Sequence, residues 1–417
     1  MKAKPFLRKL FDAALAAVSP DRVLPAHLPA APPGRTVVLA VGKAATAMAD
    51  AVAMHWGAPL TGLAVTRYGH VLPGFARHEH IELIEAGHPI PDENSMTGAR
   101  RALALARELG KDDLALVLIS GGGSALWCLP VPGLGLSDQQ CITAELLASG
   151  ASIRELNTVR KALSAIKGGK LAEAAAPARV ETLIISDVVG DDPAMIASGP
   201  TIPGGETLAD ARAILRRYGT ELPGGVRDAR DPPSSPPALR DDNQWRIVAS
   251  SADALAAAAE VAREAGFAVR VLGAVEGDAR EAAAVHARIT REVRRGGKPT
   301  VILSGGELTV KVRDRNGIGG PNTEFLLALA LELEGAADTW AIACDTDGCD
   351  GVASSAGALI GPGTLERAKM LGADPWQALD ASDSARFFEA LQDVVVTGPT
   401  QTNVSDFRAI LVGRTRH

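Results

Sequence analysis

The chain has 417 residues, of which 47% are hydrophobic and 22% are charged, so it can bury the cores of two or three globular domains. A formal net charge of -6 and only 4% aromatic residues argue against a nucleic-acid surface and favour a small ligand held in a local cationic pocket. Cys128, Cys141, Cys344 and Cys349 form no CxxC pair and have no flanking histidines at zinc-ligand spacing, which excludes an ordinary zinc site.

The first twenty residues predict an amphipathic helix rather than a secretion signal, because Asp12 interrupts their apolar stretch. No later stretch approaches the roughly 20 apolar residues that a membrane span needs. The sequence therefore predicts a cytoplasmic protein.

Short apolar runs alternate with Ala- and Leu-rich stretches along the chain, which predicts βαβ units and an α/β fold with mainly parallel sheets. Strands are expected at 36–42, 62–66, 81–85, 114–120 and 181–187, and again at 245–250, 268–273, 300–304, 308–312, 340–344, 394–397 and 409–412. Proline, glycine and charge crowd residues 222–243, which indicates a domain break. We expect two Rossmann-like domains, 1–232 and 243–417, with an active-site cleft between them.

Three glycines follow the strand expected at 114–120. In Ser120-Gly121-Gly122-Gly123-Ser124, backbone N–H groups can turn toward an anion, and the serines add hydroxyl donors. The alternative is a tight turn from strand to helix, for which one or two glycines would suffice. The loop therefore predicts an anion-binding site.

A shorter version of this loop, Ser304-Gly305-Gly306-Glu307, follows a strand in the second half. It predicts either a second ligand loop, with Glu307 near a metal or a substrate hydroxyl, or an ordinary Gly-Gly hairpin turn.

Lys43 follows the first expected strand and stands at the start of a helix. Cations are mildly unfavourable at that end of a helix, so Lys43 indicates an anionic partner there. The alternative is a solvated side chain.

Carboxylates cluster after two further strands. Asp187, Asp191 and Asp192 follow a very apolar run, which is typical of bound Mg²⁺ or of a carboxylate that takes a substrate proton. An N-cap role explains Asp192 as well, because Pro193 follows it. Asp345 opens an acidic loop that lacks the closing glutamate of a calcium loop, and it predicts either a magnesium contact or a turn.

Two nucleotide motifs are missing or incomplete. No stretch matches the Walker pattern GxxxxGK[ST], which excludes a P-loop kinase. Residues 317–322 match the dinucleotide fingerprint GxGxxG only in part, and they follow a charged hairpin-like segment instead of a buried strand.

Taken together, these motifs resemble the type II glycerate kinases, whose C-terminal part is the MOFRL domain and whose members often carry the label hydroxypyruvate reductase. The resemblance spans nearly the whole chain. It rests on 41–44 (VGKA), 87–89 (GHP), 120–124 (SGGGS), 157–161 (NTVRK), 166–169 (IKGG), 186–188 (SDV), 197–201 (ASGPT), 304–307 (SGGE), 345–348 (DTDG) and 397–403 (TGPTQTN).

The resemblance implies a kinase that transfers the γ-phosphoryl group of ATP, with Mg²⁺, to the 2-hydroxyl of D-glycerate. Catalytic roles are expected for Lys43, Asp187 and Arg160. Binding of substrate or phosphate is expected for Ser120, Gly121, Gly122, Gly123, Ser124, Ser304, Gly305, Gly306, Asn322 and Asn403. Metal contacts are expected for Asp187, Asp191, Glu307 and Asp345. Lys161 is either a further cation of the site or part of a solvated helix face.

Two positions depart from the pattern of the family. Pro321 stands where members usually carry arginine, and Ala162 stands where they usually carry histidine. Arg313 or Arg315 can supply the charge that Pro321 lacks. Both departures predict weaker turnover.

Other functions remain open at this stage. An NAD(P)H-dependent hydroxypyruvate reductase would need a dinucleotide fingerprint that the sequence hardly offers. A weakened ligand-binding relative, or a kinase for a related hydroxy acid such as a tartrate-derived one, are further alternatives. The expected partners are a small hydroxy acid, a nucleotide and a second copy in a homodimer, with neither nucleic acid nor a membrane.

Overall fold

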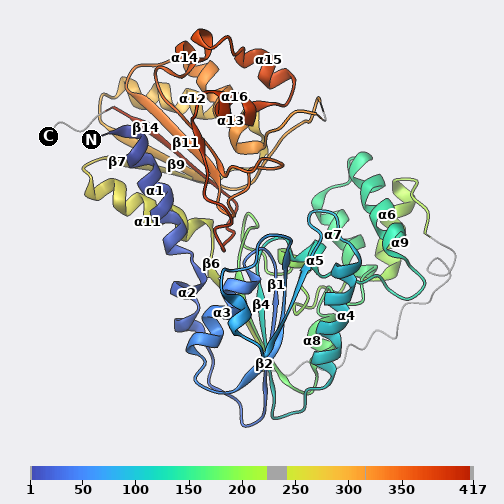
Figure 1. Ribbon diagram of the computed structural model, residues 1–417. Helices are drawn as coiled ribbons and strands as arrows, with labels where there is room; N and C mark the ends of the chain where they lie inside the picture. The colour runs from blue at the N-terminus through green and yellow to red at the C-terminus, as the bar shows by residue number, and fades with distance from the viewer. Residues whose placement is uncertain (1, 223–241, 315, 414–417) are drawn as a thin grey trace. The chain divides into compact units, whose positions relative to one another are not determined.

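Figure 1 shows the computed structural model, which describes residues 2–222, 242–314 and 316–413. The chain folds into two compact units. The N-terminal unit comprises Val23–Ser186 and Asp191–Val248, and the C-terminal unit comprises Met1–Arg22, Asp187–Gly190 and Ala249–His417. Most of the expected break at 222–243 lies outside the described residues. Within the described ranges, no helix combines the length and the apolar character needed to cross a bilayer.

Six strands form the sheet of the N-terminal unit: β1 (Thr36–Val41), β2 (Leu60–Arg67), β3 (Ile81–Ala86), β4 (Leu114–Ile119), β5 (Arg179–Ile185) and β6 (Gln244–Ala249). Their order is β3-β2-β1-β4-β5-β6, and the pairs from β3 to β5 are parallel. Strands β1 and β4 are buried along their whole length, which is why both read as unbroken apolar runs in the sequence.

Helices of two kinds complete this unit. Those packed on the sheet are α3 (Ala45–His55), α4 (Glu93–Arg107) and α8 (Lys170–Ala175). Three others, α6 (Leu136–Ala148), α7 (Ile153–Ala162) and α9 (Leu208–Arg217), share an apolar cluster of their own that includes Leu146, Leu156 and Leu215, and Figure 1 shows them beside the sheet. The shorter elements are α2 (Pro20–Val23), η1 (Pro25–His27), η2 (Phe75–Arg77), α5 (Gly123–Leu126) and η3 (Ile196–Ser198).

The main sheet of the C-terminal unit contains β7 (Ala268–Ala274), β9 (Thr300–Gly305), β11 (Thr339–Asp345), β12 (Gly357–Ile360), β13 (Val394–Val395) and β14 (Asp406–Val412). Their order is β13-β12-β11-β14-β9-β7. Only β7 and β9 pair in parallel, whereas β14 runs antiparallel to both of its neighbours. A small pair of parallel strands, β8 (Gly277–Asp278) and β10 (Leu308–Thr309), lies outside this sheet.

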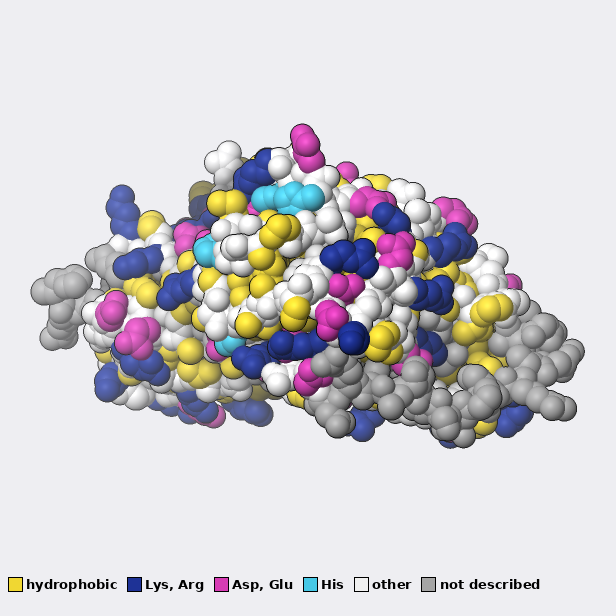
Figure 2. Space-filling view, turned by 90° about the horizontal axis from the view of Figure 1, so that it is seen from below, with side chains coloured by type: hydrophobic (Ala, Val, Ile, Leu, Met, Phe, Trp, Pro, Cys, Tyr) yellow, Lys and Arg dark blue, Asp and Glu magenta, His cyan; other side chains and the backbone are white. Residues whose placement is uncertain are grey.

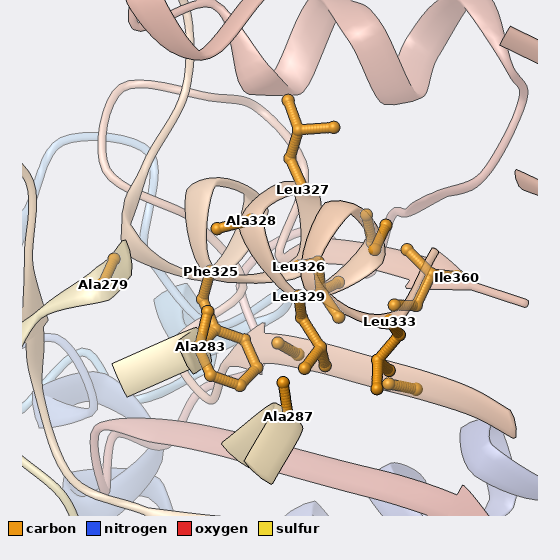
Figure 3. Packing of buried hydrophobic residues seen from close by; sticks show 14 of the residues in the cluster. Ala279, Ala283, Ala287, Phe325, Leu326, Leu327, Ala328, Leu329, Leu333 and Ile360 are labelled. Carbon is orange, nitrogen blue, oxygen red and sulfur yellow. The ribbon is translucent and has the colours of Figure 1, made fainter. Parts of the chain in front are cut away.

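Helices cover both faces of the C-terminal sheet (Figure 1). On one face lie α1 (Ala3–Ala17) and α11 (Ser251–Glu264), and Phe11 of α1 packs on Phe407 of β14 with ring centroids 5.6 Å apart. On the other lie α12 (Ala279–Arg295) and α13 (Pro321–Leu333), and Figure 3 shows the alanines of α12 beside the larger side chains of α13. The remaining helices are α14 (Thr364–Met370), α15 (Pro375–Asp380) and α16 (Ser384–Ala390).

The α/β class is confirmed, and parallel pairs predominate in the chain as a whole. The C-terminal sheet is the exception, because the segment joining β11 to β12 contains no crossover helix and the last strand, β14, enters between two strands formed earlier.

Three local expectations need correction. The strand expected to open the second domain is β6, which instead forms the edge of the first sheet, and Asn243 just before it accepts a hydrogen bond from the amide of Val180 in β5 at 2.8 Å. The strand expected at 308–312 is only the two-residue β10, and β12 was not expected. The amphipathic first helix is present, but it belongs to the C-terminal unit.

Figure 2 shows basic, acidic and apolar side chains interspersed over one face of the molecule. Among the described side chains visible there, neither charge sign forms a continuous surface. A charged ligand would therefore have to be recognised locally on this face.

Candidate active site

The carboxyl ends of β1 and β4 meet at the centre of the first sheet. From β1 the chain proceeds outward to β2 and β3, whereas from β4 it proceeds to β5 on the other side. Loops at such a reversal of strand order diverge and leave room for a ligand. The loop after β1 carries Lys43, and residues 120–124, the triple-glycine loop, follow β4.

Backbone and side-chain hydrogen bonds join these two loops. The amide of Lys43 donates to the carbonyl of Gly121 at 2.9 Å, and the amide of Ala44 donates to Ser120 Oγ at 3.0 Å. Ser120 is fully buried. Its hydroxyl therefore braces the loops, while the glycines beyond it form the outer part of the site.

Gly122 packs closely against two side chains of the site. Its φ of 83° is left-handed, and a Cβ atom there would come within 3.0 Å of His88 Cδ2 and 3.4 Å of Lys43 Cγ. Only glycine meets both conditions without strain. Lys43 and His88 thus flank Gly122, and His88 is a site neighbour that we did not predict, although its GHP motif was recognised.

Residues 197–198, whose backbone is strained, pack against the triple-glycine loop. Ala197 and Ser198 have φ values of 51° and 59°, which is unusual for residues other than glycine. The hydroxyl of Ser198 lies 2.7 Å from that of Ser124, and a Cβ on Gly123 would come within 2.7 Å of Ala197 Cβ. Backbone strain of this kind is characteristic of functional sites.

A cavity of about 790 Å³ opens beside this loop. Among the described residues, its lining contains no aspartate or glutamate but includes two cationic side chains. The lining residues are His88, Pro89, Ile90, Pro91, Gly122, Ser124, Ala125, Cys128, Ser137, Gln139, Gln140, Cys141, Thr143, Ala144, Leu147, Arg160 and Lys167.

The two adjacent cations of α7 have different environments. Lys161 is buried and its Nζ lies 2.7 Å from Glu206 Oε1, so it is neither solvated nor directed at the cavity. Arg160 lines the cavity, and in the described part of the chain its guanidinium makes no hydrogen bond or ion pair. Burial lowers the pKa of Arg160.

Lys167 is the second cation of the cavity, and our sequence analysis missed it. Only 1% of the residue is exposed, and its Nζ donates to the carbonyl of Trp127 at 2.7 Å. Burial is the main cause that lowers its pKa to about 8, with a smaller contribution from the charge of Arg160, while Cys128 opposes the shift. A buried and a half-buried cation, with no carboxylate among the described residues that line the cavity, favour an anionic ligand, because burying unpaired charge is costly.

Asp187 and Asn403, both predicted for the site, lie together in the C-terminal unit. Asn403 Nδ2 donates to Asp187 Oδ2 at 3.3 Å, and the hydroxyl of Ser405 donates to the backbone carbonyl of Asp187. Asp192 accepts a hydrogen bond from the amide of Ala194 at 3.0 Å, which fits its capping alternative.

The second Ser-Gly-Gly loop is part of a buried polar network. Ser304, 1% exposed, contacts His286 Nε2 at 2.9 Å, and Arg408 Nε donates to the same hydroxyl at 3.3 Å. Since His286 Nδ1 donates to the carbonyl of Ala282, its Nε2 accepts from Ser304. Burial holds the pKa of His286 at about 4, so this ring is neutral.

Asp406 links this network to Asn322. Its carboxylate pairs with Arg408 at 2.8 Å and accepts from Asn322 Nδ2 at 2.6 Å. Arg408 also donates to the carbonyl of Gly305, and Gly306 approaches the backbone of Val275 too closely to carry a side chain. The predicted residues Ser304, Gly305, Gly306 and Asn322 are therefore brought together, but the Ser304 hydroxyl, the Gly305 carbonyl and the Asn322 amide nitrogen are engaged inside the unit.

The acidic loop after β11 is organised by its own backbone. Asp345 accepts from the amide of Asp347 at 2.9 Å, as in the turn alternative. Asp350 accepts from the amides of Asn322 and Thr323 at the start of α13, and burial raises its pKa to about 6.

Among the described residues, no three or more His, Cys, Asp or Glu side chains gather in a metal-binding arrangement, so Asp191, Asp345, Asp187 and the exposed Glu307 form no such group.

The two departures from the family pattern have simple local surroundings. Pro321 is the first residue of α13, where its fixed φ suits the helix. Ala162 lies in the apolar cluster of α6, α7 and α9. Arg313 pairs with Asp380 at 2.7 Å, and Arg315 lies outside the described residues.

Comparison with known families finds two matches. Residues 6–230 match a family described as a domain of unknown function, DUF4147, and residues 300–406 match the MOFRL family. Together they cover both halves of the chain.

Individual proteins are similar over nearly the full length. A protein of Agrobacterium vitis named as a candidate hydroxypyruvate reductase is 50% identical, over 99% of this chain and 95% of its own. A D-glycerate 2-kinase of Thermotoga maritima is 39% identical, over 94% of each chain. A crystal structure of glycerate kinase from Thermotoga maritima has a TM-score of 0.87 and 38% identity, covering 98% of this chain and 99% of that one.

Proposed function

The chain belongs to the glycerate 2-kinase family that combines a DUF4147 domain with a MOFRL domain, and we propose that it transfers the γ-phosphoryl group of ATP to the 2-hydroxyl of D-glycerate. The observation that carries this proposal is the cavity beside the triple-glycine loop, whose described lining presents Arg160 and Lys167 and no carboxylate. A cytoplasmic location and a homodimer are parts of the proposal, and so are the two domains 1–232 and 243–417, adjusted so that α1 joins the C-terminal unit and β6 the N-terminal unit.

Phosphoryl transfer requires alignment of donor and acceptor and neutralisation of the charge on the transferred group. Lys43 flanks Gly122 and would stabilise the transferred phosphoryl group or the carboxylate of glycerate. The backbone of the triple-glycine loop would hold an anion, and Arg160 would supply a guanidinium for phosphoryl oxygens.

Asp187 would accept the proton of the attacking hydroxyl or orient that hydroxyl. The hydroxyl oxygen forms a bond to the γ-phosphorus, the bond from this phosphorus to the bridging oxygen breaks, and ADP leaves with the electron pair. Asn403, which donates to Asp187, would fix the orientation of the carboxylate.

Mg²⁺ fits this chain as an ion shared with the nucleotide. It commonly keeps several waters and uses one or two carboxylates plus substrate phosphates, so it needs no group of three protein acids. Asp187 is the first candidate to contact it, and Asp191, Glu307 and Asp345 follow. When bound, the ion neutralises phosphate charge.

The test is turnover with D-glycerate, ATP and Mg²⁺. Phosphorus NMR should identify 2-phosphoglycerate, and ADP should form in equal amount. A parallel reaction with hydroxypyruvate and NADH or NADPH is the control. Oxidation of the nicotinamide without any ADP under kinase conditions would establish the reductase instead. Nucleotide or glycerate binding without turnover would establish the weakened relative.

A further inference from the structure

The cavity beside the triple-glycine loop is much larger than a three-carbon acid requires. Sites of about 300–1,000 Å³ bury ligands the size of a drug or a cofactor, and this one has about 790 Å³. Its size therefore matches the nucleotide better than glycerate.

One part of the cavity wall is apolar and open. Ala144 and Leu147 come from α6, and Ile90 comes from residues 88–91, which are joined to α6 by a 2.8 Å hydrogen bond from Gln140 Nε2 to the carbonyl of Pro91. Ile90 and Leu147 are 70% and 57% exposed. A flat heteroaromatic ring between them would remove apolar surface of both from water.

Another part of the wall is cationic. Arg160 and Lys167 lie close enough to Cys128 for the charge of each to lower the pKa of its thiol, and Arg160 also lowers the pKa of Lys167. Gly122 and Ser124 of the triple-glycine loop line the same cavity. A ligand that is apolar and flat at one end and polyanionic at the other satisfies both parts.

We propose that this cavity is the nucleotide site, with the adenine and ribose between α6 and residues 88–91 and the phosphates toward Arg160, Lys167 and the triple-glycine loop. The proposal rests on the proposed kinase function and assigns its nucleotide to the N-terminal unit. Lys167 then binds phosphate directly.

The first test fills the apolar part of the cavity. Ala144→Trp should raise the KM for ATP at least about tenfold and leave the KM for glycerate within about twofold. Ala148→Trp is the matched control, because Ala148 is exposed one turn further along α6 but does not line the cavity. It should change neither constant. Leu147→Glu provides a second change at an exposed position and should also weaken ATP binding, through repulsion of the phosphates and loss of apolar contact.

The second test measures binding by calorimetry, without turnover. ATP, adenosine and inorganic tripolyphosphate serve as probes. Ala144→Trp should abolish adenosine binding and spare tripolyphosphate, whereas Arg160→Gln with Lys167→Met should abolish tripolyphosphate binding and spare adenosine. Thermal melts establish that each variant is folded.

The outcomes separate the two proposals. If wild type binds ATP with this pattern but phosphorylates no glycerate, the nucleotide site stands and the proposed kinase function fails. If wild type is a glycerate kinase but the folded variants Ala144→Trp and Leu147→Glu leave ATP binding unchanged, or raise only the KM for glycerate, the assignment of the nucleotide site is wrong.

Discussion

Arg408 of the C-terminal unit and the two cavity cations of the N-terminal unit, Arg160 and Lys167, differ in how their charge is compensated. In the C-terminal unit, Arg408 pairs with Asp406 at 2.8 Å and donates to Ser304 and Gly305. In the N-terminal unit, Arg160 and Lys167 line a cavity to which the described part of the chain contributes no carboxylate. A buried charge is tolerable when the protein compensates it, and otherwise a ligand has to do so. The comparison separates a network that stabilises the fold from a cluster that prepares the protein to bind an anion.

The largest effect should come from breaking the closed network. Arg408→Met should lower the free energy of unfolding by about 4 kcal/mol, because it leaves the Asp406 carboxylate buried without its cation. Urea denaturation measures the loss. Arg313→Met, at an ion pair that is half exposed, should cost less than about 1 kcal/mol. Equal losses for the two variants would remove the distinction between buried and exposed pairs.

Removing a cation of the open cluster should affect activity instead of stability. Arg160→Gln should reduce kcat/KM about a hundredfold, since it removes charge facing the phosphates, and should leave the urea midpoint nearly unchanged. The neighbouring Lys161→Gln should show the reverse, because Lys161 is buried in an ion pair with Glu206. A large stability loss in Arg160→Gln with normal kinetics would contradict the comparison.

The proposed catalytic carboxylate provides a third case. Asp187→Asn keeps the shape of the side chain and an oxygen that can accept from Asn403, so the melting temperature should hardly move. The rate should fall about tenfold to a hundredfold as the charge disappears. Wild-type turnover across a Mg²⁺ titration would make Asp187 a structural turn residue.

The pH dependence of ATP binding tests whether the charge of Lys167 serves ligand binding. Its pKa is about 8 in the folded protein against an ordinary value of 10.5, so between these values the unfolded chain binds more protons, and the stability of the ligand-free protein rises with pH. ATP binding needs the charged form and should weaken above pH 8, by up to about tenfold per pH unit. Burial raises the pKa of the neighbouring Cys128 thiol and lowers the pKa of Arg160 and of Lys170. Calorimetric titrations of wild type and Lys167→Met from pH 7 to 10 should show a slope only in wild type, and a slope retained by the variant would assign it to another group.

The smallest expected effect concerns Pro321. Pro321→Arg adds a planar cation beside Asn322 at the start of α13 and should raise kcat a few-fold. Loss of a proline that suits the first helical turn opposes this gain by destabilising the start of the helix. Steady-state kinetics with ATP and glycerate measure the gain. An unchanged kcat in a folded variant would show that this position handles no phosphoryl charge.

The sequence allowed much of the first unit to be predicted. Alternating strands and helices predicted its parallel sheet, and Lys43 and the triple-glycine loop were both identified because their types and positions are distinctive without reference to other residues. Their adjacency follows from the order of β1 and β4, which local patterns do not contain.

Long-range packing explains what the sequence could not reveal. Lys167 lies in the IKGG motif at 166–169, but the motif alone assigns no role to this lysine, whose burial depends on packing around the distant Trp127. Ser304 looked like a ligand donor because a hydroxyl beside glycines has the same sequence signature when it serves a buried histidine and arginine. The antiparallel pairing of β14 likewise depends on strands more than 60 residues apart.

The position of α1 has a consequence for biosynthesis. A ribosome makes this helix before α11, β11 and β14, on which its apolar face packs. During translation Phe6, Leu10 and Phe11 therefore stay without their native neighbours until residues as far along the chain as Phe407 of β14 have emerged. Units whose contacting elements are far apart in sequence close late and expose apolar surface in the meantime, which promotes aggregation while the chain is incomplete.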